Sequence, residues 1–170
     1  AWWFMDFYKL KLFTIGRLQY RYRRIKEDTP WGGRVLKANT YYIDVHIPGG
    51  GPLLPELCQD SYDRAAAYFR RRYQLKEVIF GCYSWLLSPD LDDILPPTSN
   101  ILAFGHQYTL AEAVPDTEYS HLTFAFGVRG VPEDLNALPE KTSLHRVLKP
   151  WLLKGNILRL GKGYFIHKQP

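Results

Sequence analysis

Alternation of apolar and polar residues predicts two strands in the first third of the chain. In residues 17–26, the side chains of Leu18, Tyr20 and Tyr22 fall on one face and arginines fall on the other. Residues 35–47 end in the same alternation. The segment between the two strands is rich in turn-forming residues, so we expect the strands to pair as an antiparallel hairpin.

The polar face of this hairpin gathers groups that can do chemistry. Asp44 and His46 lie on that face of the second strand, opposite Arg17, Arg21 and Arg23 of the first. Cross-strand neighbours on one face sit about 5 Å apart, so we expect Asp44 to pair with an arginine. Two interpretations stay open: a solvated sheet face with weak ion pairs, or a functional cleft.

A helical pattern follows the hairpin, and a buried strand follows the helix. Residues 55–73 place apolar side chains on one stripe, and Pro55 suits a first helical turn because proline has no N–H to leave unpaired. Residues 78–87 are an almost continuous apolar run, typical of a central strand covered on both faces. A helix that connects two strands is a crossover, so we expect residues 41–47 and 78–87 to run parallel.

The pattern predicts further elements towards both ends of the chain. These are a helix over residues 2–15, a short helix over 88–95, a short helix or strand over 101–108, a strand over 121–128, a helix over 142–154 capped by Thr142, and a strand hairpin over 157–167 around Gly161 to Gly163. This order of elements is typical of an α+β (mixed α/β) fold, in which the central sheet contains both parallel and antiparallel strands.

The loop between the second strand and the long helix is the most informative feature. Gly49, Gly50 and Gly51 follow the strand at once, and the helical pattern begins near Pro55. A strand, a glycine loop and a helix N-terminus together present bare backbone N–H groups to an anionic ligand. No Gly-x-Ser-x-Gly elbow, P-loop lysine motif or Rossmann fingerprint is present, which argues against a serine hydrolase, an NTPase and a dehydrogenase.

Composition narrows the class of protein. The chain has 170 residues, of which 46% are hydrophobic and 15% aromatic, enough for one domain with a sizeable core. No apolar run approaches the roughly 20 residues that span a bilayer, so we expect no membrane association. Cys58 and Cys82 are too few for a disulfide framework, which favours reduced thiols and a cytoplasmic location. Without CxxC or HExxH spacing, we expect no metal.

Two further properties concern what the chain binds. Its net charge of +5 suits an anionic cofactor, an acidic substrate or RNA, although an ordinary basic surface would give the same value. The first residue is not Met, so we expect a fragment of a longer protein in which a partner domain completes the site.

Short segments spread over nearly the whole chain carry a family resemblance. They are GRLQY at residues 16–20, VHIP at 45–48, GPL at 51–53, SWLL at 84–87, SNI at 99–101 and TSL at 142–144. Their order and spacing resemble the GNAT-like C-terminal domain of bacterial two-domain acyltransferase-like proteins. The resemblance implies a single GNAT-like domain over residues 1–170, with a mixed, mostly antiparallel central sheet flanked by helices and an N-terminal helix over residues 1–15 packed on it.

The resemblance also implies a cofactor site. In GNAT acyltransferases two central strands splay apart and acyl-CoA lies in the gap, which here implies acetyl-CoA or another acyl-CoA between residues 41–47 and 78–87. The phosphate loop would then use Ile47, Gly49, Gly50, Gly51, Leu53 and Leu54. The family's Arg/Gln-x-x-Gly-x-Gly/Ala loop is absent, and its arginine is missing here. Pro48, Pro52 and Pro55 also remove three N–H donors from the loop.

Acyl transfer to an amine needs a base for the ammonium proton and an acid for the leaving thiolate. His46 is the candidate base, because an imidazole titrates near neutral pH. Asp44 lies about 7 Å along the same strand and would bias His46 towards protonation. Ser84 or Tyr83 is the candidate acid. The plainer interpretations are a surface histidine and a buried hydroxyl bonded to backbone.

Three functions therefore remain in competition. The first is an acyl-CoA-dependent N-acyltransferase, or the acceptor half of one. The second is a non-catalytic GNAT-like module that binds a ligand or a partner domain, which the missing loop arginine favours. The third is a nucleic-acid binder that uses Arg21, Arg23 and Arg24 with Tyr20 and Tyr22, as single-strand binders do. It ranks last because strand alternation turns these tyrosines away from Arg21 and Arg23.

Overall fold

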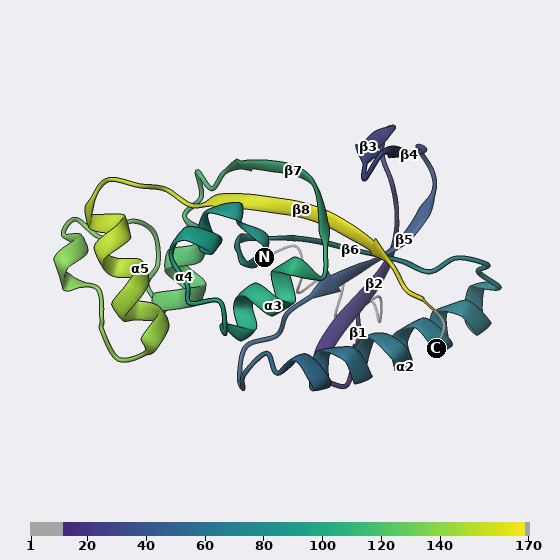
Figure 1. Ribbon diagram of the computed structural model, residues 1–170, viewed down its shortest axis with the longest axis horizontal. Helices are drawn as coiled ribbons and strands as arrows, with labels where there is room; N and C mark the ends of the chain where they lie inside the picture. The colour runs from purple at the N-terminus through teal and green to yellow at the C-terminus, as the bar shows by residue number, and fades with distance from the viewer. Residues whose placement is uncertain (1–11, 169–170) are drawn as a thin grey trace.

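The computed structural model describes residues 12–168, and a six-stranded sheet forms its centre (Figure 1). In spatial order, the strands are β1 (Phe13–Ile15), β2 (Leu18–Arg24), β5 (Tyr41–His46), β6 (Ile79–Ser84), β8 (Arg159–Ile166) and β7 (Thr109–Pro115). Neighbouring strands are antiparallel except β5 and β6, which run parallel. The sheet is therefore mixed and mostly antiparallel, as we expected.

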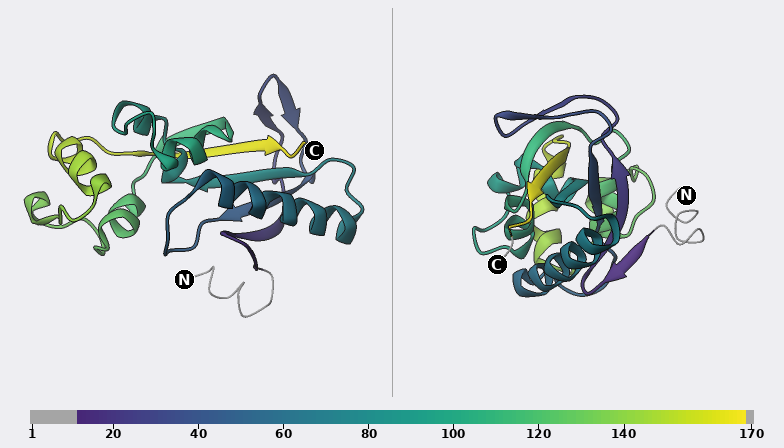
Figure 2. Two further views of the ribbon diagram at one scale, coloured as in Figure 1. Left: turned by 60° about the horizontal axis from the view of Figure 1, so that its bottom comes forward. Right: turned by 90° about the vertical axis from the view of Figure 1, so that its right-hand side faces the viewer.

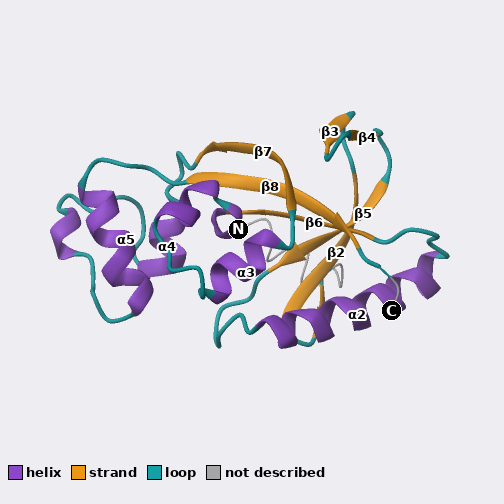
Figure 3. Ribbon diagram, in the orientation of Figure 1, coloured by secondary structure: helices purple, strands orange, loops and turns teal. Residues whose placement is uncertain are grey.

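Helices cover the sheet unevenly. The long helix α2 (Pro55–Tyr73) runs along one face of the sheet, and the short helices gather at the far end of β7 and β8 (Figures 2 and 3). These short elements are α3 (Asn100–His106), α4 (Ser120–Phe126), α5 (Ser143–Leu153) and the 3₁₀ helices η1 (Trp85–Leu87), η2 (Pro89–Asp93) and η3 (Leu135–Ala137). Within the described part of the chain, no helix is long and apolar enough to cross a membrane.

The hairpin predicted near the N-terminus is confirmed. β2 pairs antiparallel with β5, and its apolar face packs on α2, where the rings of Tyr20 and Phe69 lie 6.4 Å apart. Leu18, Tyr20 and Phe69 are fully buried, so this face is the main core. The bounds predicted for the long helix are also those observed, and both cysteines are free and buried.

The central strands and several helices are likewise as predicted. The parallel pairing of β5 and β6 is observed, and β6 lies between β5 and β8 with its first four residues buried. Thr142 caps α5 through a hydrogen bond that its hydroxyl oxygen accepts from the His145 N–H. The ambiguous segment at residues 101–108 is mostly helix, in α3.

Two predictions near the C-terminus are wrong, the strand over residues 121–128 and the hairpin over residues 157–167. Residues 121–128 are not a strand but mostly helix α4, whose first turn is fixed by the upstream Asp116: its carboxylate accepts hydrogen bonds from the Ser120 hydroxyl and the His121 N–H. Residues 157–167 form no hairpin, because β8 runs straight through Gly161 and Gly163. β7, which pairs with β8, was not predicted at all.

The N-terminal predictions need smaller corrections. Residues 13–15 are strand β1 rather than the end of a helix, and the rest of the predicted helix over residues 2–15 lies mainly outside the described residues. The segment predicted as a plain turn contains β3 (Thr29–Trp31), which pairs with β4 (Arg34–Leu36) in a separate two-stranded sheet. Only the second half of the predicted strand over residues 35–47 joins the main sheet.

The glycines of β8 resemble a hairpin turn in the sequence, but Gly161 has a different role. A Cβ at this position would lie only 2.7 Å from the carbonyl carbon of Leu87, which is backbone and cannot swing aside. Glycine is needed here for close approach of two chain segments, not for a bend.

We predict that Gly161→Ala destabilises the fold by about 2 kcal/mol or more, because the added methyl overpacks a backbone contact. Gly49→Ala is the matched control: its Cβ would meet nothing within 4 Å, so a change within about 0.5 kcal/mol is expected. Urea unfolding of the two variants measures both values. Equal stability of the two variants would show that η1 does not press on β8.

Candidate active site

The candidate site lies where β5 and β6 part. The two strands are paired at Ile43 with Phe80 and at Asp44 with Gly81. β5 continues to His46 while bonded to β2, and β6 continues to Ser84 while bonded to β8. A gap therefore opens at the carboxyl ends of two parallel strands, which is where open sheets with parallel strands bind ligands.

An apolar cavity of about 870 Å³ fills one side of this gap. Its walls come from the glycine loop after β5, from η1 and from the α3–α5 region. Residues that line it include Ile47, Gly49, Gly50, Gly51, Leu53, Trp85, Leu86, Phe124, Leu144 and Val147. The sequence-predicted loop residues thus come together here, except Leu54. Leu54 is not among the lining residues and is instead the N-cap residue of α2, where its carbonyl accepts hydrogen bonds from the N–H groups of Leu57 and Cys58.

The glycine loop is shaped by its glycines. Gly50 and Gly51 have φ values of 88° and 73°, a region that favours glycine. None of the backbone N–H groups of Gly49, Gly50, Gly51 and Leu53 donates a hydrogen bond to another described residue. Unpaired donors beside the N-terminus of the 19-residue helix α2 make this wall of the cavity electropositive.

Arg17 organises this loop, and sequence analysis missed that role. Its guanidinium donates to the carbonyl oxygens of Pro48, Gly51 and Pro52 at 3.1, 3.0 and 3.1 Å. Arg17 also lines the apolar cavity. The sequence pattern places Arg17 on the polar face of β2 near Asp44, but Arg17 lies in the turn before β2. No local signal marks it, because all three of its partners lie more than 30 residues away in the sequence.

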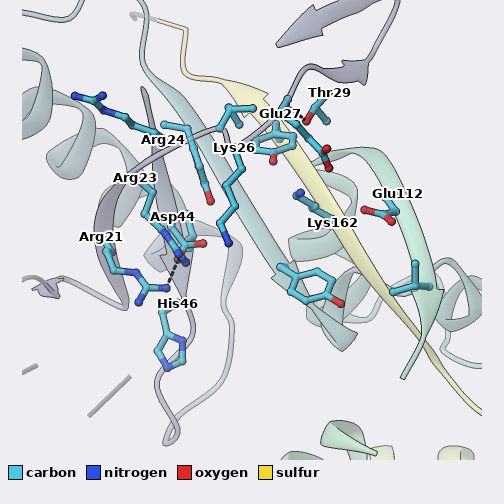
Figure 4. A pocket seen from close by; sticks show the side chains of 16 residues that line it. Arg21, Arg23, Arg24, Lys26, Glu27, Thr29, Asp44, His46, Glu112 and Lys162 are labelled. Carbon is cyan, nitrogen blue, oxygen red and sulfur yellow. Dashed lines mark hydrogen bonds and ion pairs between the residues drawn. The ribbon is translucent and has the colours of Figure 1, made fainter. Parts of the chain in front are cut away.

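A polar cavity of about 480 Å³ lies on the sheet face opposite α2. Figure 4 shows the side chains that line it. Charged side chains from β2 and β5 form one wall, and Glu112 of β7 and Lys162 of β8 form another. Val45, His46 and Tyr83 line both this cavity and the apolar one. The two cavities therefore meet at His46 on one strand and Tyr83 on the other.

Asp44 pairs with arginine, as predicted. Its carboxylate accepts a hydrogen bond from Arg21 at 2.8 Å and lies 3.7 Å from the guanidinium of Arg23. The pKa of the nearby His46 is lowered, chiefly by burial and also by Arg21, while Asp44 acts to raise it. Asp44 thus works in the expected direction, but burial outweighs it, so His46 favours the neutral form that can accept a proton.

The two candidate acids differ in their surroundings. The Ser84 hydroxyl oxygen accepts a hydrogen bond from the Leu86 N–H and caps η1, which is the plainer role considered for it. Tyr83 is 56% exposed and stands at the junction of the cavities. Its pKa is raised, by partial burial and by Glu112, Asp116 and Glu118, so its hydroxyl keeps its proton at neutral pH.

The tyrosines of β2 are not placed for stacking on nucleic acid bases. Tyr20 is fully buried, and its hydroxyl bonds to Ser61. Tyr22 stacks between Tyr41 and Tyr73, with ring centroids 4.5 and 3.8 Å away. Both rings are already engaged within the protein, which argues against the nucleic-acid interpretation.

Comparison with known proteins agrees with this geometry. Solved structures described as an acyltransferase with decanoyl-CoA and teicoplanin, and with CoA and 10C-teicoplanin, match with TM-scores of 0.81 and 0.80 at 29% identity. They cover 97% and 96% of this chain. A mutant acyltransferase with octanoyl-CoA matches at 28% identity over 99% of this chain, with a TM-score of 0.81. This chain spans about half the length of those chains, at 49%, 49% and 50%.

No curated protein matches the chain by sequence. Residues 12–165 match a family model described as the GNAT-like C-terminal domain. This match covers nearly the whole chain, and it agrees with the mixed sheet, the parting of β5 and β6 and the glycine loop between strand and helix. The chain therefore belongs to the family of GNAT-like C-terminal domains.

Proposed function

We propose that this chain is an acyltransferase domain that transfers an acyl group from acyl-CoA to an amine acceptor. One observation carries the proposal: an apolar and a polar cavity meet at His46 and Tyr83, where β5 and β6 separate. A thioester that enters from the apolar side and an amine that enters from the polar side would meet at this junction.

Acyl-CoA fits the apolar side. The pantetheine and acyl chain would occupy the cavity, and the pyrophosphate would accept hydrogen bonds from the free N–H groups of the glycine loop at the N-terminus of α2. Arg17 would add the positive charge that the loop itself lacks. The matched acyltransferases were crystallised with CoA, decanoyl-CoA and octanoyl-CoA, which supports acyl-CoA as the donor here.

The reaction needs two proton transfers. The amine nitrogen attacks the thioester carbonyl carbon, a C–N bond forms and the C–S bond breaks. His46 would take the proton that the amine loses, because its lowered pKa keeps it neutral. Tyr83 would give its proton to the CoA thiolate from the other side of the gap. Asp44 and Ser84 would serve as positioning residues, through Arg21 and through η1.

The wider setting of the domain is part of the proposal. Because the chain spans about half of the matched acyltransferases, we infer that a preceding partner domain stands beside it in the whole protein. The two free, buried cysteines fit a cytoplasmic and, by the family resemblance, bacterial protein.

We predict that acetyl-CoA, decanoyl-CoA and free CoA bind with affinities measurable by calorimetry, and that Gly50→Asp weakens binding at least about tenfold. An added carboxylate would repel the pyrophosphate at the loop. Gly33→Asp is the matched control, since Gly33 also has positive φ and open space around its Cβ but lies in the β3–β4 turn. Undetectable binding to the wild-type chain would leave the non-catalytic module as the better interpretation.

Arg17→Gln tests the loop clamp. We expect about a tenfold loss of CoA affinity, because the variant removes a charge and at least one of the three hydrogen bonds that hold the loop. Arg129→Gln changes the same charge at an exposed position away from both cavities and should bind CoA normally. Equal losses in the two variants would mean that only net charge matters.

The pH dependence of kcat tests His46. Because burial lowers its pKa below the ordinary value of 6.5, kcat at saturating acceptor should rise with pH through an ionisation below 6.5 and then level off. His46→Gln should lower kcat by about 100-fold or more and abolish this ionisation. An NMR titration of the imidazole measures the same pKa directly. An unchanged pH profile in the variant would remove His46 from the mechanism.

A further inference from the structure

The polar cavity carries more positive than negative charge. Its cationic side chains are Arg21, Arg23, Arg24, Lys26 and Lys162, and its carboxylates are Glu27, Asp44 and Glu112. Five cations and three anions leave a formal net charge of +2 in the cavity that also contains His46 and Tyr83. A bare amine, which is an ammonium ion in solution, would be repelled by such a surface.

Two lysines of this cavity differ from its arginines, because their amino groups have no partner among the described residues. Arg21 and Arg23 share the carboxylate of Asp44, and the guanidinium of Arg24 lies 4.5 Å above the ring of Tyr41. The side-chain amino groups of Lys26 and Lys162, in contrast, form no hydrogen bond or ion pair with any residue that the structure describes.

The geometry directs both amino groups into the cavity. Figure 4 shows Lys26 reaching from the end of β2 towards Asp44, and Lys162 of β8 pointing its amino group inward from the opposite wall. Lys162 is opposite Glu112 in the β7–β8 register, yet these two described side chains make no ion pair within 4 Å. Lys162 is also opposite Tyr83 in the β6–β8 register, which places it beside the proposed reaction centre.

We propose that the acceptor is an amine that also carries an anionic group, a phosphate or a carboxylate, and that Lys26 and Lys162 bind this group while the amine faces His46. This inference rests on the proposed function and names the substrate class of the same site. The anion would balance the excess charge of the cavity. The same cations would disfavour the ammonium form of the bound amine, which helps to deliver the neutral nucleophile.

Matched pairs of small amines test the proposal through binding, independently of turnover. Ethanolamine against O-phosphoethanolamine tests the phosphate, and β-alaninamide against β-alanine tests the carboxylate. Each probe is titrated into the full chain at low salt with saturating CoA, and Kd is measured by NMR. We expect the anionic member of at least one pair to bind about tenfold tighter or better, with the advantage shrinking as salt rises.

Variants then locate the effect. The Lys26→Gln, Lys162→Gln double variant should reduce the preference to about threefold or less, whereas Lys76→Gln, Lys154→Gln removes the same charge at exposed positions outside both cavities and should retain it. The single variant Lys26→Gln, at an exposed position, should already lower the preference and guards against misfolding of the double variant. Whether the preference appears in the phosphate probes or in the carboxylate probes shows which anionic group the cavity binds.

Two results would overturn the inference. One is equal or tighter binding of the neutral member in both pairs. The other is a preference that survives the loss of both lysines, which would place the anion elsewhere, for example on the glycine loop. Failure of the proposed function is detected separately, as the absence of CoA binding or of acyl transfer. In that case the probe titrations are repeated without CoA, and they still decide whether the cavity selects anionic amines.

Discussion

The structure depends on one departure from regular sheet geometry: β5 and β6 stop pairing after Asp44 and Gly81, while each stays bonded to its outer neighbour. The rings of Tyr42 and Tyr164 pack over Gly81 at this point, where a Cβ would lie 2.7 Å from each. Backbone groups on the inner edges beyond that point lose their strand partners, and such groups need partners of some kind. A ligand that lies between the strands can provide them.

The alternation of side chains along the strands decides the character of the two cavities. β2 and β5 turn their apolar side chains towards α2 and their charged ones towards the opposite face. The gap connects an apolar space beside the glycine loop and η1 with a polar space on the open face. His46 lies at the boundary, buried enough to have a lowered pKa yet within reach of the charged face. This arrangement suits the proposed function, whose two reactants differ in polarity.

Much of this could be predicted from local sequence, but the rest could not. The bounds of α2 follow from Pro55 and an apolar stripe, and the antiparallel pairing of β2 with β5 follows from two alternating patterns. Residues 121–128 alternate as well as any strand, yet form α4 because Asp116 fixes its first turn. Gly161 appears as a turn signal in sequence, whereas its actual role is contact with Leu87. Local pattern cannot distinguish these cases, since the deciding partners come from tertiary structure.

Arg17 shows why the absence of a family loop motif was weaker evidence than it seemed. A phosphate group is bound by the positive charge and the hydrogen-bond donors around it, whichever part of the sequence provides them. Here a turn between β1 and β2 brings a guanidinium onto three carbonyls of the loop. The three hydrogen bonds from Arg17 to these carbonyls fix the loop. Pro48 and Pro52 restrict its backbone further, because the φ angle of a proline is locked. The prolines that remove donors thus also preorganise the glycine N–H groups that remain.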